Sequence, residues 1–231
     1  IWLDESAGKR LVAGGEAEEI EPLYGKHYLP RKFKIAITIP PYNDMDVYAN
    51  DIGLIAIAEN GKLQGFNVAV GGGLGLTFGR EDTYARLASV IGFCTPEQVL
   101  DVCYQIVAIQ RDFGNRQDRK LSRFKYTIDK YSLEWFKQEL NTRLGFDLAA
   151  IRPFEFTTTG DRFGWSETAD GLWHLGLRLE YGRILDTETE KLKTALLEIA
   201  RLNLCTFRMT GNQNLVLVNV KPEYKRVVEG F

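Results

Sequence analysis

The alternation of apolar and polar residues predicts strands in the first part of the chain and helices after them. Apolar runs with strand character lie at about residues 33–39, 53–58 and 64–70. Asn60 and Gly61 separate the last two runs, and this pair favours a tight hairpin because both residues accept positive φ. The prolines at 40–41 end the first run, since proline cannot continue a paired strand.

Helical signals follow the strands. Residues 83–91 have apolar positions at helical spacing, which predicts a helix there. The segment 95–97 is Thr-Pro-Glu, which predicts a second helix start with a hydroxyl cap and an acid in the first turn. Ser132 is the expected cap of a third helix, and Gly145 its expected end.

The pattern restarts after the Ile-Arg-Pro at 151–153. A strand is predicted at 173–179, an amphipathic helix at 189–202, and two strands at 206–210 and 215–220. This β-α-β-β order is typical of a ferredoxin-like half-domain. Because strands and helices do not alternate regularly, we predict an α+β fold class rather than a doubly wound sheet. The predicted domains are residues 1–160 and 161–231.

Composition and charge narrow the class of protein. The 231 residues carry a net charge of −2 with a pI near 5.9, so nothing global favours nucleic acid or a membrane surface. Three widely spaced cysteines with no C-x-x-C pair cannot alone build a zinc site or an iron–sulfur cluster, and they suit a reducing cytoplasm. No run is long enough for a membrane span, and no signal peptide is evident.

The first 27 residues add two expectations. Residues 4–27 are rich in acids and glycine and are predicted to form a surface loop. The chain starts at Ile1 without an initiator Met, and we expect a fragment of a longer protein.

Three cations stand at the entrance of the first apolar strand. Arg31, Lys32 and Lys34 precede Ile35, with Phe33 between the two lysines. Alternation along a strand would place both lysines on one face and Phe33 on the other. Charges beside a buried strand are costly unless an anion meets them, which favours an anionic ligand. A solvated strand end is the alternative.

Three further segments have the composition of anion sites, each with an ordinary alternative. Gly71, Gly72 and Gly73 leave a strand and either cradle an anion with backbone N–H groups or form a tight turn. The basic stretch 111–125 is either a salt-bridged surface or a set of arms for a polyanion. The turn 210–214 concentrates amides that can donate hydrogen bonds to a ligand, as asparagine-rich turns also do without one.

Several motifs together resemble the siroheme-dependent sulfite and nitrite reductase family, closest to its sulfite-reducing hemoprotein branch. They occur in the family's order and are LPRKFK (29–34), NDIG (50–53), GFNVAVGGGLG (65–75), TYARLA (83–88), NRQDRK (115–120), KYTID (125–129), IRPFEF (151–156), GDRFGW (160–165), GRILD (182–186), LLEIA (196–200) and TGNQNL (210–215). The resemblance implies a sulfite and nitrite reductase-like mixed-sheet domain followed by a ferredoxin-like half-domain.

The resemblance also implies chemistry. The family couples siroheme to a [4Fe-4S] cluster and reduces sulfite to sulfide, or nitrite to ammonia. Siroheme carries eight carboxylates, which would account for many separated cations. The cluster cysteines belong to a later segment of the family, so the isolated chain is expected to be inactive.

Site residues follow from the resemblance. Lys32 and Lys34 match the catalytic lysines that face the substrate, where they would attract sulfite and supply protons. The matching cofactor-binding positions are Arg31, Gly71, Gly72, Gly73, Arg123, Lys125, Gln213 and Asn214. Nitrite-reducing members resemble LPRKFN, so Lys34 favours sulfite.

The expected partners are sulfite and an electron donor, either an NADPH-linked flavoprotein or ferredoxin, and GDRFGW favours the NADPH-linked type. A ferredoxin-dependent nitrite reductase is the first alternative. The second is a non-catalytic protein that binds an anion or tetrapyrrole. Nucleic-acid binding through 111–125 is a third and weaker alternative.

Overall fold

The computed structural model describes residues 2–3, 10–11 and 21–231, and the predicted acidic loop at 4–27 lies largely outside these ranges. The chain divides into two compact units. The first contains residues 1–36 and 48–153, and the second contains 37–47 and 154–231. The division into domains 1–160 and 161–231 stays a prediction.

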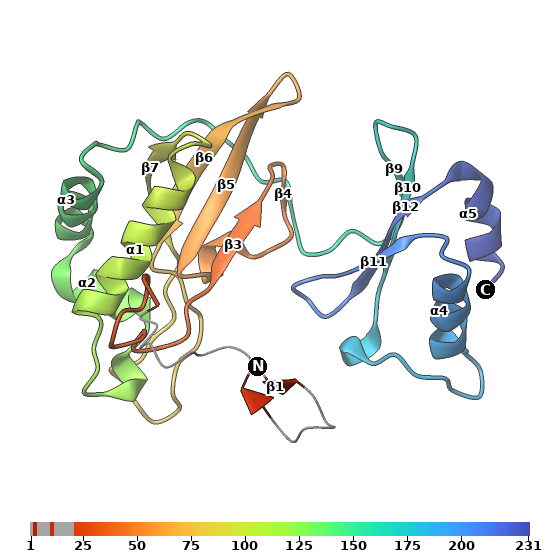
Figure 1. Cartoon of the computed structure of the whole chain (residues 1–231), viewed down its shortest axis with the longest axis horizontal. Helices are drawn as coiled ribbons and strands as arrows, with labels where there is room; N and C mark the ends of the chain where they lie inside the picture. The colour runs from red at the N-terminus through yellow and green to blue at the C-terminus, as the bar shows by residue number, and fades with distance from the viewer. Residues whose placement is uncertain (1, 4–9, 12–20) are drawn as a thin grey trace. The chain divides into compact units, whose positions relative to one another are not determined.

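A four-stranded sheet organises the first unit (Figure 1). Its strands, in spatial order, are β3 (Ile35–Thr38), β5 (Ile52–Glu59), β6 (Lys62–Val70) and β7 (Ser89–Cys94). The predicted hairpin between β5 and β6 is confirmed, since Asn60 and Gly61 have φ of 52° and 72°. The sheet therefore puts the segment that follows β6 beside the segment that precedes β5.

Three helices pack against this sheet (Figure 1), namely α1 (Val99–Phe113), α2 (Phe124–Tyr131) and α3 (Leu133–Leu144). Ile106, Phe124 and Phe136 belong to one core with the inward residues of β5 and β6. The predicted start and end of α3 are confirmed: Ser132 accepts a hydrogen bond from the Trp135 backbone, and Gly145 closes the helix.

The helix predicted at 83–91 is wrong. Residues 83–88 are irregular and Ser89–Cys94 is strand β7, paired antiparallel with β6. Val90, Ile91 and Phe93 are β-branched or aromatic residues that pack well in a sheet. Pairing with the edge of β6 therefore stabilises a strand here, and this outweighs the helical spacing of the apolar residues. The next helix begins later than predicted, at Val99, because 96–98 forms a turn in which the Gln98 side chain accepts the Thr95 N–H.

The second unit is built on an antiparallel sheet with the order β11-β12-β10-β9 (Figure 1). Its elements are β9 (Gly164–Glu167), β10 (Trp173–Leu177), α4 (Leu192–Arg201), β11 (Thr206–Met209), β12 (Leu215–Val220) and α5 (Pro222–Glu229). The predicted β-α-β-β order is confirmed, and β9 and α5 extend it. Leu196, Ile199 and Leu217 form the centre of its core.

Short elements complete the chain. They are β1 (Trp2–Leu3), β2 (Arg10–Leu11), β4 (Tyr42–Asn43), β8 (Thr158–Thr159), and the 3₁₀ turns at Val47–Ala49, Arg119–Leu121 and Glu180–Gly182. The α+β fold class is confirmed by this mixture of antiparallel sheets and helices. Among the described residues no helix combines the length and apolarity needed to cross a bilayer.

All three cysteines carry free thiols. Cys94 is fully buried in the first core, and burial raises the pKa of its thiol to about 12. Cys103 and Cys205 are half-buried and pack against the first and second cores. Burial raises the pKa of Cys103 to about 11, so both thiols of the first unit are protonated at neutral pH.

Candidate functional site

Lys34 and Asp51 are joined at the entrance of the sheet. The Lys34 backbone N–H donates to Asp51 Oδ2 at 2.8 Å, and Lys34 Nζ donates to the Ala49 carbonyl at 2.8 Å. Asp51 is only 4% exposed, while Lys34 is half-buried. Phe33 packs on Phe124 with ring centroids 5.3 Å apart, which turns it into the core. The strand entrance therefore has an apolar side and a charged side.

The glycine loop after β6 is bonded to the same place. The Gly71 N–H donates to the Asp51 carbonyl at 2.9 Å, and the Gly72 N–H donates to the Asn50 carbonyl at 3.0 Å. The Gly73 N–H donates to the Arg86 carbonyl at 2.8 Å. All three N–H groups are thus occupied by the protein and are not free donors for an anion. The role of this loop as a place of close cofactor approach stays a prediction.

Close packing explains why glycine is needed here. A Cβ added at Gly72 would lie 2.2 Å from the Tyr48 carbonyl oxygen and 2.6 Å from that of Asn50. At Gly71, which has a φ of 78°, a Cβ would lie 2.8 Å from Ile128. These are backbone atoms and a buried side chain, so neither position has room for a side chain.

Lys125 is a buried cation that holds this loop. Its side chain is fully buried in α2, and Nζ donates to the carbonyls of Gly73 at 3.0 Å, Gly75 at 2.7 Å and Tyr84. Burial lowers the pKa of Lys125, and the nearby Arg123 lowers it further, while Asp129 and Asp51 oppose that change. All three N–H donors of the ammonium are engaged by carbonyls, so direct contact of Lys125 with siroheme stays a prediction.

A second group of bonds holds the same loop from Asp129 in α2. Arg86 donates from Nη1 to the Gly71 carbonyl at 2.9 Å and from Nε to Asp129 Oδ1 at 2.8 Å. The other oxygen of Asp129 accepts the Tyr84 hydroxyl at 2.8 Å. The pKa of Tyr84 is raised to about 12, first by burial and then by this bond. Two residues of α2 thus hold the glycine loop: Lys125 bonds Gly73 and Gly75 directly, and Asp129 reaches Gly71 through Arg86.

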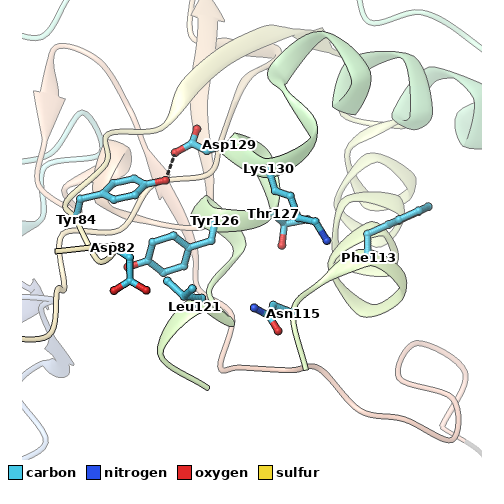
Figure 2. Close-up of a pocket in the computed structure, with 9 residues that line it drawn as sticks. All are labelled: Asp82, Tyr84, Phe113, Asn115, Leu121, Tyr126, Thr127, Asp129 and Lys130. Carbon is cyan, nitrogen blue, oxygen red and sulfur yellow. Dashed lines mark hydrogen bonds between the residues drawn. The ribbon is translucent and has the colours of Figure 1, made fainter. Parts of the chain in front are cut away.

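A pocket of about 360 Å³ lies beside Tyr84 and Asp129 (Figure 2). Its other lining residues are Asp82, Phe113, Asn115, Leu121, Tyr126, Thr127 and Lys130. Figure 2 shows the Tyr84 hydroxyl pointing to Asp129 at one side of it. None of the predicted site residues lines this pocket, and its two acids are already paired with Arg80 and Arg86.

The side chains of three of the predicted cations form no hydrogen bond or ion pair within the described part of the chain. Arg31 and Arg123 are half-buried, and Lys32 is exposed. A Cβ at Gly75 would lie 3.7 Å from Arg123 Nη2, which places that guanidinium beside the loop. Unpaired, half-buried guanidinium groups are well suited to bind carboxylates from a ligand.

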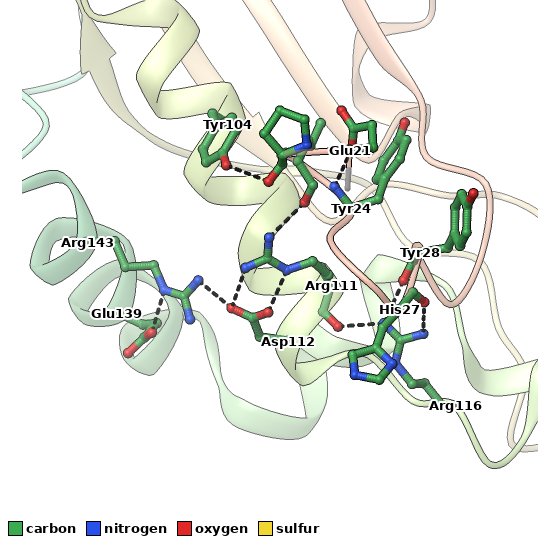
Figure 3. Close-up of polar contacts among 12 residues, drawn as sticks. Glu21, Tyr24, His27, Tyr28, Tyr104, Arg111, Asp112, Arg116, Glu139 and Arg143 are labelled. Carbon is green, nitrogen blue, oxygen red and sulfur yellow. Dashed lines mark hydrogen bonds and ion pairs between the residues drawn. The ribbon is translucent and has the colours of Figure 1, made fainter. Parts of the chain in front are cut away.

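Two further residues of the basic stretch serve the fold (Figure 3). Arg111 donates to the Leu23 carbonyl and pairs with Asp112, and Arg116 donates to the His27 carbonyl. Asp112 also accepts Arg143 at 2.8 Å. These bonds tie residues 21–28 to α1, and α1 to α3. The salt-bridged interpretation is confirmed for Arg111, whereas the bonds of Arg116 go to backbone carbonyls.

The amide turn belongs to the second unit. Asp161 organises it, since its carboxylate accepts Thr210 Oγ1 at 2.5 Å and Asn214 Nδ2 at 2.7 Å. Asn214 Oδ1 also accepts the Leu179 N–H at 2.8 Å, so this side chain is structurally engaged. Gln213 is exposed with a φ of 65°, and its side chain makes no hydrogen bond to a described residue. Of the predicted pair, only Gln213 is free to reach a ligand.

The first unit brings four of the predicted site residues to Asp51, a residue that sequence reasoning missed: Lys34, Gly71, Arg123 and Lys125. Lys34 and Arg123 both act electrostatically on the Asp51 carboxylate, and Asp51 acts on Lys125. Burial raises the pKa of Asp51, whereas the Lys34 N–H and the charges of Lys34 and Arg123 lower it. The available signal was an acid placed directly before an apolar strand. Arg86, Asp129 and Asp161 lie in the motifs at 83–88, 125–129 and 160–165, but their partners are distant in sequence, so no local pattern indicates their bonds.

Two family descriptions match the chain. "Nitrite and sulphite reductase 4Fe-4S domain" covers residues 2–148, and "Nitrite/Sulfite reductase ferredoxin-like half domain" covers residues 166–229. The first match alone spans more than half of the chain.

Similar proteins carry one name. The chain is 56% identical over 226 residues to the sulfite reductase [NADPH] hemoprotein beta-component of Paenibacillus sp. (strain JDR-2), covering 97% of this chain and 39% of that protein. It is 54% identical to the protein of that name from Geobacillus thermodenitrificans (strain NG80-2), covering all of this chain and 40% of that protein. The chain therefore spans about 40% of the length of these relatives.

A solved structure has the same fold. The NirA protein of Mycobacterium tuberculosis superposes with a TM-score of 0.72 at 25% sequence identity. The match covers 87% of this chain and 35% of that protein.

Proposed function

Because this chain belongs to the nitrite and sulfite reductase family, we propose that it is the central part of a siroheme- and [4Fe-4S]-dependent sulfite reductase. The whole protein would reduce sulfite to sulfide in sulfur assimilation. The names of its relatives specify sulfite, which supports this function over nitrite reduction. The observation that carries the proposal is the group of unpaired cations at the LPRKFK motif and Arg123, in a chain that matches both family descriptions.

The lysines are proposed to act on the substrate. Lys32 is exposed and unpaired among the described residues, so its ammonium is available to an incoming anion. Lys34 is half-buried and held by the Ala49 carbonyl, which fixes where its charge stands. Together they would attract sulfite and donate protons as its oxygens leave as water. Lys34, in place of an asparagine, would favour the more highly charged anion.

The residues present fit a polycarboxylate cofactor. Arg31 and Arg123 are half-buried cations whose side chains form no hydrogen bond or ion pair among the described residues, and we propose that they bind siroheme carboxylates. Gly71, Gly72 and Gly73 would let the backbone approach the macrocycle, with Lys125 holding the loop. Siroheme, coupled to the cluster, would supply electrons to the bound anion. In the second unit, Gln213 is proposed to contact the cofactor through its side-chain amide, and Asn214, bonded to Leu179 and Asp161, to hold the shape of that turn.

The cluster ligands are proposed to come from another part of the whole protein. Within residues 2–3, 10–11 and 21–231 no three His, Cys, Asp or Glu side chains are grouped to hold a metal. The names of the relatives specify sulfite and NADPH, and the proposed partners are therefore sulfite and an NADPH-linked electron donor, which we propose is a flavoprotein, with ferredoxin as the alternative donor. We further propose a cytoplasmic enzyme that acts without nucleic acid or membrane.

A visible absorption spectrum of the full-length protein tests this function. We expect a siroheme spectrum that shifts when sulfite is added under reducing conditions, with sulfide as the product. Preferential turnover of nitrite would instead support the nitrite reductase alternative. A full-length protein that binds siroheme but turns over neither anion would support a non-catalytic binder. One that cannot be reconstituted with siroheme would overturn the proposal.

A further inference from the structure

Asp51 occupies an unusual place for a carboxylate. It is nearly inaccessible to solvent and lies where the cation-bearing strand entrance and the glycine loop meet. Its side chain accepts the Lys34 N–H, and its own carbonyl accepts the Gly71 N–H. One residue therefore connects two of the predicted site segments by direct hydrogen bonds.

The charges around Asp51 are those of the proposed anion site. Lys34 and Arg123 both act on its carboxylate, and Asp51 in turn acts on Lys125. No ion pair between Asp51 and any cation of the described chain lies within 4 Å, so its negative charge acts on the site as a field rather than through a salt bridge. A negative charge in this position weakens the attraction of the site for any anion.

The hydrogen bond from Lys34 to Asp51 does not require that Asp51 be charged. Burial raises the pKa of this carboxyl, so ionisation costs folding free energy as the pH rises through that pKa. The Lys34 N–H needs only an acceptor, which a neutral amide oxygen also provides. A buried ionisable group that is costly to charge and surrounded by cations is a candidate for a role in binding.

We propose that the Asp51 carboxylate sets the anion affinity and charge selectivity of the site, as a positioning residue that offsets part of the charge of Lys34 and Arg123. This inference rests on the proposed function, because it assumes that sulfite meets Lys34. The penalty from one negative charge doubles for a dianion. Asp51 thus weakens sulfite binding more than nitrite binding, which would also help reduced product to leave.

The test compares Asp51→Asn with wild type in the full-length holoenzyme. Asparagine keeps the shape and the acceptor for the Lys34 N–H while removing the charge. In mildly alkaline buffer, the sulfite Kd from the siroheme absorption shift should fall about threefold to tenfold, and the nitrite Kd about twofold to threefold. Carbon monoxide is neutral, so its affinity for the reduced siroheme should not change, and neither should siroheme content.

Asp147→Asn is the matched control. It removes the same charge from an exposed residue of the first unit and keeps an acceptor for Asn141. Its sulfite Kd should equal that of wild type. An Asp51→Asn enzyme with full siroheme content and unchanged or weaker sulfite binding would overturn the proposal.

A second background guards against misfolding. The same substitution is also made in the Lys34→Met protein. That background has one positive charge fewer beside Asp51, so removing the carboxylate leaves less repulsion between cations there. If Asp51→Asn loses siroheme in both backgrounds, the residue is structural and the proposal is wrong. A wild-type protein that binds neither siroheme nor sulfite would refute the proposed function before any variant is compared, so the two failures are distinct.

Discussion

The buried ammonium of Lys125 donates to the carbonyl oxygen of Gly75, 2.7 Å away, across 50 residues of sequence. The same ammonium bonds the Gly73 and Tyr84 carbonyls. A cation that gathers three carbonyls fixes the path of the glycine loop without a metal ion. It also places the loop beside Arg123, and so it holds the proposed site in shape.

Removing this ammonium should loosen the loop. Lys125→Met keeps most of the side-chain volume but leaves three carbonyls, one of them on the buried Gly73, without their donor, so we expect the free energy of unfolding to fall by about 3 kcal/mol. Urea denaturation measures this loss, and hydrogen exchange should show faster exchange at residues 71–86. Lys130→Met, on the exposed face of α2, is the control and should change stability by less than about 1 kcal/mol. Equal effects of the two substitutions would contradict the role given to Lys125.

Two glycines of the loop should differ sharply in their tolerance of alanine. A Cβ at Gly72 would overlap the carbonyl oxygens of Tyr48 and Asn50, so Gly72→Ala should cost about 3 kcal/mol or more. A Cβ at Gly75 meets only Arg123 Nη2 at 3.7 Å, an ordinary contact, so Gly75→Ala should be nearly neutral. Thermal unfolding of both variants provides the comparison, and a stable Gly72→Ala would show that the two backbone segments can separate without cost.

Lys34 should influence the choice of anion. Lys34→Asn in the full-length enzyme removes one positive charge, and the ratio of kcat/KM for sulfite to that for nitrite should fall on the order of tenfold. Lys62→Asn removes a charge from an exposed position at the start of β6 and should leave the ratio unchanged. Steady-state kinetics with both anions test this, and an unchanged ratio for Lys34→Asn would count against sulfite selection by this residue.

The Tyr84 hydroxyl should lose its proton at a higher pH than an ordinary tyrosine. Its pKa in the folded protein is about 12, above the ordinary value of 10.0, because burial and the bond to Asp129 both favour the protonated form. The stability that this proton contributes is therefore full below pH 10 and is lost as the pH rises from 10 to 12. The stability difference between wild type and Tyr84→Phe, measured by urea denaturation, should be constant up to pH 10 and shrink above it. A difference that already shrinks near neutral pH would contradict the assignment.

Much of the architecture could be predicted from local sequence. The β5–β6 hairpin follows from Asn60 and Gly61, and the limits of α3 follow from Ser132 and Gly145, because positive φ and helix capping are properties of single residues and their immediate neighbours. Residues 83–91 were predicted wrongly, since the pairing edge offered by β6 is a non-local interaction that outweighs helical spacing.

The sequence by itself determined the fold class, the family motifs and the cations of the proposed site, since each depends on residue type and order along the chain. Only the tertiary structure decided what those residues contact. The N–H groups of Gly71, Gly72 and Gly73 are occupied, Lys125 holds a loop, and Asp51 lies among the cations. The physical reason is that each partner is a backbone carbonyl, an N–H group or a charge that only the folded chain brings within reach.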